Sequence, residues 1–247
     1  MIGDLRIANP PNRPKLGRMI AAIIVAAGRG TRMGPDVDKL FLEVAGKPIV
    51  VHAWERFAGH PMIDHIVLVI KDGLQSTFRE FPEKYHPILK QKPYSIVLGG
   101  SQRQDSVWNG LQSLGTDVEL VAIHDGARPC TSPQLITQTL SAARETGAAV
   151  AAQRATDTVK ESNDGSTITH HLDRSRLWTV QTPQAFRVDV IIKALGYVRE
   201  QNLSVTDDTA ACAYIQQPVR LIESSAPNPK ATAPSDLPIL ETLLARL

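Results

Sequence analysis

Short apolar runs alternate with amphipathic segments along most of this chain. The first run, Ile20–Ala26, is apolar throughout, which is typical of a β-strand that is covered on both faces. Behind Pro48, which suits the first turn of a helix, apolar residues recur at helical spacing as far as Phe57. Strands that alternate with helices form a mostly parallel sheet, because each connection has to cross one face of the sheet. The sequence therefore predicts an α/β fold with a Rossmann-like, mostly parallel sheet flanked by helices. Its further strands are expected at His65–Ile70, Ser95–Leu98, Glu119–Ile123 and Ala148–Ala152.

One segment interrupts this alternation. Thr158–Lys160 and Thr167–His171 are short and β-like, and the sequence Asn163-Asp164-Gly165 between them favours a tight hairpin turn. We expect residues 154–177 to form a protruding β-hairpin arm, which is either a flap over a binding site or a contact to a partner. The α/β pattern then resumes with a strand near Trp178–Gln181, a helix through Val198, a strand at Val219–Ile222 and a terminal helix from Ser235.

Length and composition favour one globular domain. The chain has 247 residues, of which 43% are hydrophobic and 21% charged, so one large core is expected over residues 19–247. Residues 1–18 contain prolines and scattered charges without a continuous apolar stretch, and we expect a flexible leader there, not a secretory signal. No apolar run is long enough for a transmembrane helix, so no membrane partner is expected. Because only one helix is expected after Lys230, we expect no second, fused enzyme.

Charge and cysteine content narrow the range of partners. The net charge of +2 is not concentrated in a basic face, so nucleic acid is not an expected partner and any phosphate recognition must be local. Cys130 and Cys212 have no metal-ligand spacing, which disfavours a zinc site and a disulfide framework. Two small buried thiols in a cytoplasmic protein are expected.

Three polar or glycine-rich segments follow expected strands. They are Ala27–Lys39, Gly99–Ser106 and His124–Pro129. Ligands of open parallel sheets bind beyond the carboxyl ends of the strands. We therefore expect these segments to converge on one crevice.

The first of these segments has the composition of a phosphate-binding loop. Its glycines let backbone N–H groups approach a phosphate closely, and Arg32 and Lys39 supply cationic donors. A P-loop is excluded because the sequence GxxxxGK(S/T) is absent. A dinucleotide-binding GxGxxG is excluded because Met33 occupies its third glycine position and Pro35 interrupts the segment. The alternative is an ordinary strand–helix turn with solvated basic residues.

Several motifs carry a resemblance to a known family. AAGRGTRMG at residues 26–34, a lysine soon after it and then GKPIV resemble the signature of sugar nucleotidyltransferases. IHDGARP (123–129), LDRSRLW (172–178), QTPQAF (181–186), TDD (206–208) and NPK (228–230) follow in the order found in 2-C-methyl-D-erythritol 4-phosphate cytidylyltransferases. The chain departs from that family at Asp38, Gly126 and Pro229, where proline, alanine and isoleucine are usual.

The resemblance implies an enzyme that transfers CMP from CTP to 2-C-methyl-D-erythritol 4-phosphate in non-mevalonate isoprenoid biosynthesis, with release of pyrophosphate. Ribitol 5-phosphate or a related polyol phosphate is the alternative acceptor. A phosphate monoester is already a nucleophile at neutral pH, so the reaction needs cations in fixed positions more than it needs a strong base. The implied cofactor is Mg²⁺ or another hard divalent cation. A non-catalytic nucleotide-binding protein is disfavoured, because the cations and the acidic residue of the family are present.

The resemblance also implies roles for individual residues. The implied catalytic cations are Arg32, Lys39 and Lys230. Asp125 is the implied metal ligand, although an aspartate at a strand end also suits a turn or a helix cap. The implied nucleotide contacts are Ala26, Ala27, Gly28, Gly30, Arg32, Lys39, Gly99, Gly100, Ser106 and Asp125. The implied contacts to the polyol phosphate are Arg128, Thr158, Arg174, Thr182 and Thr206.

Two of these residues, Thr158 and Arg174, fall on the expected arm. In the family the arm embraces a second subunit and completes its site, which implies a homodimer with shared active sites. Of the residues outside this set, Arg103 is expected to be structural or close to the ribose, and His124 to be packed. Asp207 and Asp208 either start a helix or join the site.

Overall fold

The computed structural model describes residues 18–28 and 39–246, and its architecture is the α/β fold expected from the sequence. A 7-stranded sheet has the strand order β11-β7-β10-β6-β1-β4-β5. All neighbouring pairs are parallel except those of β10, which runs antiparallel to both β6 and β7. The strands are β1 (Met19–Ala26), β4 (His65–Ile70), β5 (Tyr94–Leu98), β6 (Val118–Asp125), β7 (Ala148–Arg154), β10 (Trp178–Arg187) and β11 (Arg220–Glu223).

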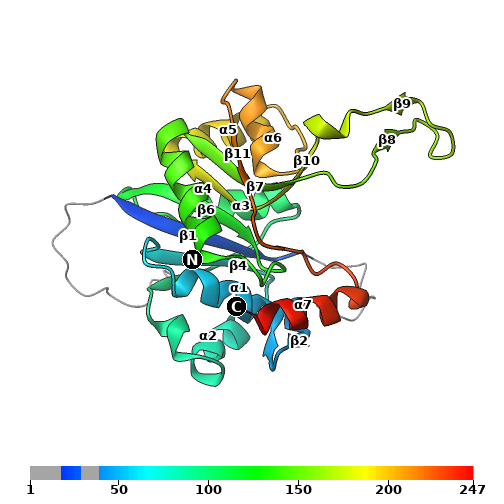
Figure 1. The fold of residues 1–247 in the computed structure, drawn as a ribbon. Helices are drawn as coiled ribbons and strands as arrows, with labels where there is room; N and C mark the ends of the chain where they lie inside the picture. Colours follow the sequence, from blue (N-terminus) through cyan, green and yellow to red (C-terminus); the bar gives the residue numbers. More distant parts are fainter. Residues whose placement is uncertain (1–17, 29–38, 247) are drawn as a thin grey trace.

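Helices cover both faces of the sheet (Figure 1). One face packs against α1 (Ile49–Ala58), α2 (Gln75–Lys84), α4 (Pro133–Thr146) and α7 (Leu237–Leu244). The other packs against α3 (Arg103–Gln112), α5 (Val188–Glu200) and α6 (Asp208–Tyr214). Each strand of the sheet interior therefore contributes alternate side chains to two separate cores, which explains why β1 is apolar at every position.

Local signals place most element boundaries correctly. Ser132 caps α4, since its hydroxyl accepts a hydrogen bond from the backbone N–H of Leu135 at 3.2 Å. Strand β10 is longer than the expected strand at Trp178–Gln181, because it continues through a break in pairing between Val180 and Gln184. Helix α2 was not expected, because the residues it buries, Phe78, Phe81 and Pro82, are few among charged neighbours.

The expected arm is present. Its hairpin pairs β8 (Lys160–Glu161) with β9 (His170–His171), a shorter ladder than the sequence indicates. The turn is held by Asp164, whose Oδ1 accepts hydrogen bonds from the N–H groups of Ser166 and Thr167 at 2.8 and 2.7 Å. The arm extends away from the body of the molecule (Figure 1).

Three further expectations concern membrane-spanning helices, the cysteines and the leader. Within the described ranges, no helix combines the length and apolarity needed to cross a bilayer. Cys130 and Cys212 are both buried as free thiols. The expected leader lies outside the described residues as far as position 17.

Candidate active site

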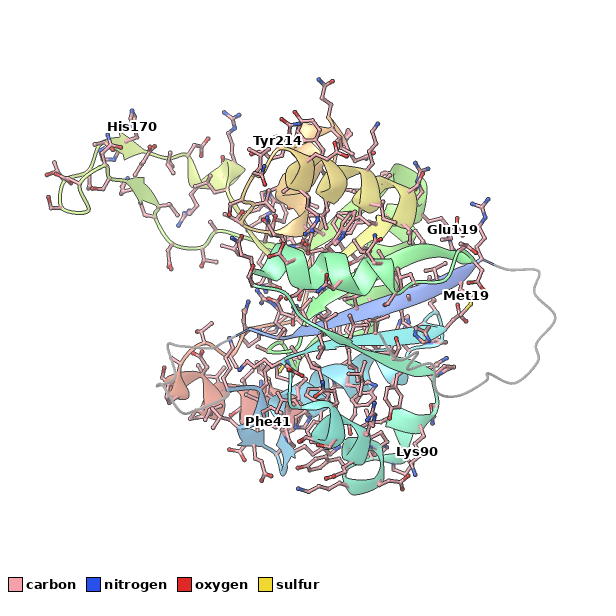
Figure 2. The ribbon with its side chains drawn as sticks, turned by 180° about the vertical axis from the view of Figure 1, so that it is seen from behind. Met19, Phe41, Lys90, Glu119, His170 and Tyr214 are labelled. Atoms are coloured by element: carbon pink, nitrogen blue, oxygen red, sulfur yellow. The ribbon has the colours of Figure 1, made fainter. Side chains whose placement is uncertain are left out.

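The polar segments that follow the strands meet at one edge of the sheet. Met19 and Glu119, near the amino ends of β1 and β6, lie at one side of the molecule, and the arm that carries His170 leaves from the other (Figure 2). On that second side, Gly99 approaches Ala27 so closely that a Cβ atom at position 99 would collide with the Ala27 methyl group. Glycine at position 99 is thus what allows the segments after β5 and β1 to meet above the end of β4.

Asp125, at the end of β6, is the centre of this edge. Its side chain is 11% exposed, and it is paired with two cations that come from distant parts of the chain. Lys230 Nζ donates to Oδ2 at 2.6 Å, and Arg103 Nε donates to Oδ1 at 3.3 Å. Burial opposes ionisation, but Arg103 and Lys230 outweigh it and hold the pKa of Asp125 well below its usual range. Asp125 is therefore a carboxylate at neutral pH.

A second carboxylate lies behind Arg103. Asp208, which is fully buried, accepts a hydrogen bond from Arg103 Nη1 through Oδ2 at 2.8 Å. Burial raises the pKa of Asp208, and the guanidinium of Arg103 is the charge that opposes this change. Asp207, its neighbour, is the helix cap of α6, since its Oδ1 accepts from the N–H of Ala210 at 2.9 Å. Asp207 therefore starts the helix, whereas Asp208 contacts Arg103 beside Asp125.

His124 and Thr182 form a hydrogen-bonded unit next to Asp125. His124 Nε2 lies 2.9 Å from the carbonyl oxygen of Arg128, and its Nδ1 lies 3.0 Å from Thr182 Oγ1. Because a carbonyl oxygen only accepts, Nε2 must carry the proton, and Nδ1 then accepts from the Thr182 hydroxyl. The same hydroxyl accepts from the N–H of Asp125 at 3.1 Å. This network fixes the backbone of Asp125 and confirms that His124 is a packed residue.

Asn228 holds the segment that carries Lys230. Its Nδ2 donates to the carbonyl oxygen of Thr182 at 2.8 Å, its Oδ1 accepts from Thr131 at 3.0 Å, and its own carbonyl accepts from Arg128 Nη1 at 2.7 Å. The side chain is 2% exposed, so these bonds replace water completely. Lys230 is thereby held beside Asp125 although proline replaces the usual residue at position 229.

Lys39 belongs to the same group of cations. Its Nζ donates to the carbonyl oxygen of Ala231 at 3.1 Å, one residue beyond Lys230. Leu40, the next residue, is 3% exposed and anchors the segment in the core. Arg32, Gly30 and Asp38 lie outside the described residues, so their predicted roles remain predictions.

The segment after β5 forms a tight turn into α3. The hydroxyl of Ser106 accepts from the N–H of Gly100 at 3.0 Å and donates to the carbonyl of Gln102 at 3.1 Å. Asp105 Oδ2 accepts from the N–H of Gln102 at 3.1 Å, which makes it part of the helix cap. The segment is thus a capped turn between a strand and a helix, and it leaves Gly99 beside Ala27.

The position Gly126 departs from the family pattern for a visible reason. A Cβ atom there would lie 3.2 Å from the carbonyl oxygen of Val25 and 3.2 Å from Val50 Cγ2. The N–H of Gly126 donates to that same carbonyl at 3.0 Å, which draws the turn after β6 against β1. Glycine therefore fits this turn more easily than alanine would.

The structure brings together only part of the predicted polyol-binding set. Arg128 and Thr182 lie beside Asp125, and exposed Thr206 precedes the Asp207–Asp208 pair by one residue. Thr158 and Arg174 are exposed on the arm, where Arg174 Nη1 donates to the carbonyl of Thr156 at 2.7 Å. Among the described residues, these two are not joined to the Asp125 group.

Arg103 and Asn228 are the residues whose contacts the sequence did not reveal, whereas a place of Asp208 in the site was one of two alternatives. Arg103 stands in a helix-starting turn, where a solvated arginine is common, and no periodicity predicts that it points toward β6. Asn228 precedes a proline in a loop, which indicates a turn and not a buried amide. The motif NPK was the one available signal for Asn228.

The group is built to receive anions. Within the described ranges, Lys230 and Arg103 bond the buried carboxylate of Asp125, and the charge of Arg128 also lowers its pKa. Lys39 bonds the carbonyl of Ala231, the residue that follows Lys230. Cations held in fixed positions around a partly desolvated centre stabilise developing negative charge more strongly than solvated ones. This is the arrangement that transfer between two phosphates requires.

Comparison with known proteins gives a consistent result. The sequence model of the family described as IspD: 2-C-methyl-D-erythritol 4-phosphate cytidylyltransferase matches residues 20–246. A 2-C-methyl-D-erythritol 4-phosphate cytidylyltransferase of Pelotomaculum thermopropionicum is 39% identical over 225 residues, which cover 91% of this chain and 94% of that protein. One of Desulforamulus reducens is 40% identical over 227 residues, covering 92% and 96%.

Solved structures agree with these matches. A 4-diphosphocytidyl-2C-methyl-D-erythritol synthase of Anaerococcus prevotii superposes with a TM-score of 0.80 at 29% identity, covering 93% of this chain and 100% of that one. A 2-C-methyl-D-erythritol 4-phosphate cytidylyltransferase of Thermus thermophilus gives a TM-score of 0.75 at 29% identity, with the same coverage.

Proposed function

This chain belongs to the 2-C-methyl-D-erythritol 4-phosphate cytidylyltransferase family, and on that premise we propose which of its residues perform the family's reaction. The chain is a nucleotidyltransferase that transfers CMP from CTP to 2-C-methyl-D-erythritol 4-phosphate in isoprenoid biosynthesis. The observation that supports our assignment of residues is the buried Asp125, with Lys230 and Arg103 on its two oxygens. Lys39 bonds the backbone carbonyl of Ala231, next to Lys230.

The reaction exchanges one phosphorus–oxygen bond for another. An oxygen of the acceptor phosphate attacks the α-phosphorus of CTP, a new P–O bond forms, and the bond to the bridging oxygen of the β-phosphate breaks so that pyrophosphate leaves. The attacking phosphate needs no deprotonation at neutral pH, so the chain has mainly to overcome repulsion between two anions. Lys39, Lys230 and Arg32 are the cations that we assign to the triphosphate and to the charge on the five-coordinate phosphorus.

The nucleotide is assigned to the edge formed by Ala26, Ala27 and Gly28 on one side and by Gly99, Gly100 and Ser106 on the other. Gly30 is a further proposed contact. The contact between Gly99 and Ala27 supports this assignment, because it brings two backbone segments together without intervening side chains. A base can approach such a surface closely, and we expect a pocket of cytosine size that excludes purines by their volume.

Asp125 suits Mg²⁺ of the kind that binds together with a nucleotide. Mg²⁺ is usually held by one or two carboxylates together with substrate phosphates, and it prefers hard oxygen ligands. Asp125 supplies one ionised carboxylate at the edge of the crevice, and no group of three or more possible ligands occurs among the described residues. When bound, the ion would supply charge neutralisation at the phosphate oxygens. Lys230 is the neighbour placed to exchange its contact with Asp125 for a phosphate.

The acceptor phosphate is assigned to Arg128, Thr182 and Thr206 of one chain and to Thr158 and Arg174 of a second. This division is proposed because Arg128 and Thr182 lie beside Asp125, whereas Thr158 and Arg174 are exposed on the projecting arm. An arm that makes few contacts with its own body is suited to embrace another copy. The proposed assembly is a homodimer in the cytoplasm, where the two buried thiols stay reduced.

Release of pyrophosphate tests the assignment of substrates. The purified chain is incubated with Mg²⁺, each of the four common ribonucleoside triphosphates in turn, and either 2-C-methyl-D-erythritol 4-phosphate or ribitol 5-phosphate. We expect release above background with CTP and the methylerythritol phosphate. Faster release with ribitol 5-phosphate would assign the acceptor to the alternative, and release with purine triphosphates at a similar rate would contradict the proposed base pocket.

A further inference from the structure

Arg103 touches both carboxylates of the crevice edge, and none of the roles assigned above uses it. Its guanidinium bridges Asp125 and Asp208 through two different nitrogen atoms, Nε at 3.3 Å and Nη1 at 2.8 Å. Its side chain is 28% exposed, against 11% for Asp125 and 0% for Asp208. An exposed arginine would form such pairs weakly, but here both partners are buried, so the pairs hold a defined geometry.

The backbone of Arg103 is also fixed from a second direction. The next residue, Gln104, donates through Nε2 to the carbonyl of Leu203 at 3.0 Å and accepts from the N–H of Val205 at 2.9 Å. The loop that leads to Thr206 and Asp208 is therefore bound to the first turn of α3. The backbone of Arg103 is thus held in place, and its guanidinium bonds two buried carboxylates.

The two oxygens of Asp125 have different partners. Arg103 takes Oδ1, and Lys230 takes Oδ2. Arg103 is also bonded to the buried Asp208 at 2.8 Å, whereas Lys230 has no second carboxylate partner among the described residues and its side chain is 32% exposed. When a triphosphate competes for the cations, Lys230 is the partner that can leave, and Arg103 is the partner that stays.

We propose that Arg103 is a positioning residue that holds Oδ1 of Asp125 and so presents Oδ2 as the single oxygen available to a divalent cation. Asp208 acts through Arg103, because it anchors the far end of the guanidinium. A carboxylate with one free oxygen suits Mg²⁺, which requires near-octahedral geometry. A carboxylate with both oxygens free can also bind in a bidentate manner, which Ca²⁺ accepts. This inference rests on the proposed role of Asp125 in binding the metal–nucleotide.

The alternative is that Arg103 merely neutralises two buried acids and supports the fold. Both roles predict that loss of Arg103 lowers stability, since removal of one partner leaves a buried carboxylate unpaired. They differ in cation preference, because a structural support has no reason to alter the ratio of two metal affinities.

The test uses the double variant Arg103→Gln/Asp208→Asn, in which neither buried charge is left alone. Isothermal titration measures CTP binding at increasing Mg²⁺ or Ca²⁺ without the second substrate, so turnover is not needed. The matched control is Arg199→Gln. Arg199 of α5 pairs at 3.0 Å with Asp105 of α3, the helix that carries Arg103, and lies over Trp108, but it does not bond Asp125. Asp125→Asn serves as the reference for a lost ligand.

We expect the double variant to stay folded and to shift the ratio of half-saturating Mg²⁺ to Ca²⁺ by at least ~5-fold in favour of Ca²⁺. Its kcat with Mg²⁺ should fall about 10- to 100-fold, as is usual when a residue that orients a metal ligand is lost. The control should keep the wild-type ratio. An unchanged ratio in the double variant would overturn the proposal, whether or not kcat falls.

Should the double variant fail to fold, Asp208→Asn alone provides the test, because it leaves Arg103 with Asp125 but removes its anchor. A smaller shift of the same ratio is expected, and an unchanged ratio again contradicts the proposal. The proposed function fails separately: either the wild-type chain releases no pyrophosphate, or Asp125→Asn keeps the wild-type dependence of CTP binding on Mg²⁺.

Discussion

Replacement of His124 by asparagine should remove a large part of the loss of stability that this protein shows below pH 7. The imidazole is completely buried between Phe57, whose ring centre lies 4.8 Å away, and the Thr182 hydroxyl. Its Nδ1 must accept a hydrogen bond there, because Nε2 donates to the carbonyl of Arg128. A proton added to Nδ1 would lose that hydrogen bond, and burial lowers the pKa of His124 to about 4.

The sign and the size of the contribution of His124 to the free energy of unfolding follow from the linkage between proton binding and folding. Above pH 6.5, the ordinary pKa of histidine, His124 is neutral in both states and its contribution to stability is complete. As the pH falls below that value, the unfolded chain binds a proton that the folded chain refuses, so the free energy of unfolding decreases. The decrease amounts to about 2 kcal/mol by pH 5 and to about 3 kcal/mol once the pH reaches the folded-state pKa.

Urea unfolding at several pH values between 7.5 and 4.5 measures this contribution. The wild-type chain should lose more stability than this one residue accounts for, because burial also lowers the pKa of His52, His60 and His65. The free energy of unfolding is plotted against pH for both proteins, and the difference in slope between wild type and His124→Asn gives the contribution of His124. Thr146→Val is a suitable control, since loss of its bond to Ala142 should cost about 1 kcal/mol equally at every pH. Parallel pH curves for wild type and His124→Asn would refute the reasoning.

Three further predictions concern the crevice and the arm. Lys39→Met should lower turnover by at least ~100-fold, or ~2.7 kcal/mol, with folding intact, and a near-normal kcat in a pyrophosphate assay would contradict a catalytic role. Asn228→Ala leaves the Thr182 carbonyl and the Thr131 hydroxyl without their bonds in a buried place, so it should lower the free energy of unfolding by about 2–4 kcal/mol; a loss below about 1 kcal/mol in urea would show that the site relaxes around the gap. Replacement of residues 159–172 by a short glycine–serine turn should give a monomer by light scattering that still binds CTP but no longer transfers CMP, whereas a fully active monomer would refute shared active sites.

The sequence was sufficient for the parts of this protein that depend on neighbouring residues. The strands at Ile20–Ala26 and His65–Ile70 were predictable because a run of apolar residues is stable only where both faces are covered. The turn at Asp164 and the cap at Ser132 were predictable because each bonds to backbone within three residues. The motifs around Asp125 and Thr182 identified the family for the same reason, since they are short and continuous.

Tertiary structure alone decided which charged groups meet. Arg103 and Asp208 are separated by 105 residues, as are Asp125 and Lys230, and no periodicity relates them. Their contact depends on strand order, because antiparallel β10 lies between β6 and β7 and brings Thr182 beside the end of β6. From the sequence, Arg103 was therefore expected only to be structural or close to the ribose, with no partner named. It bridges two buried carboxylates because the fold brings the start of α3 beside the end of β6 and the start of α6.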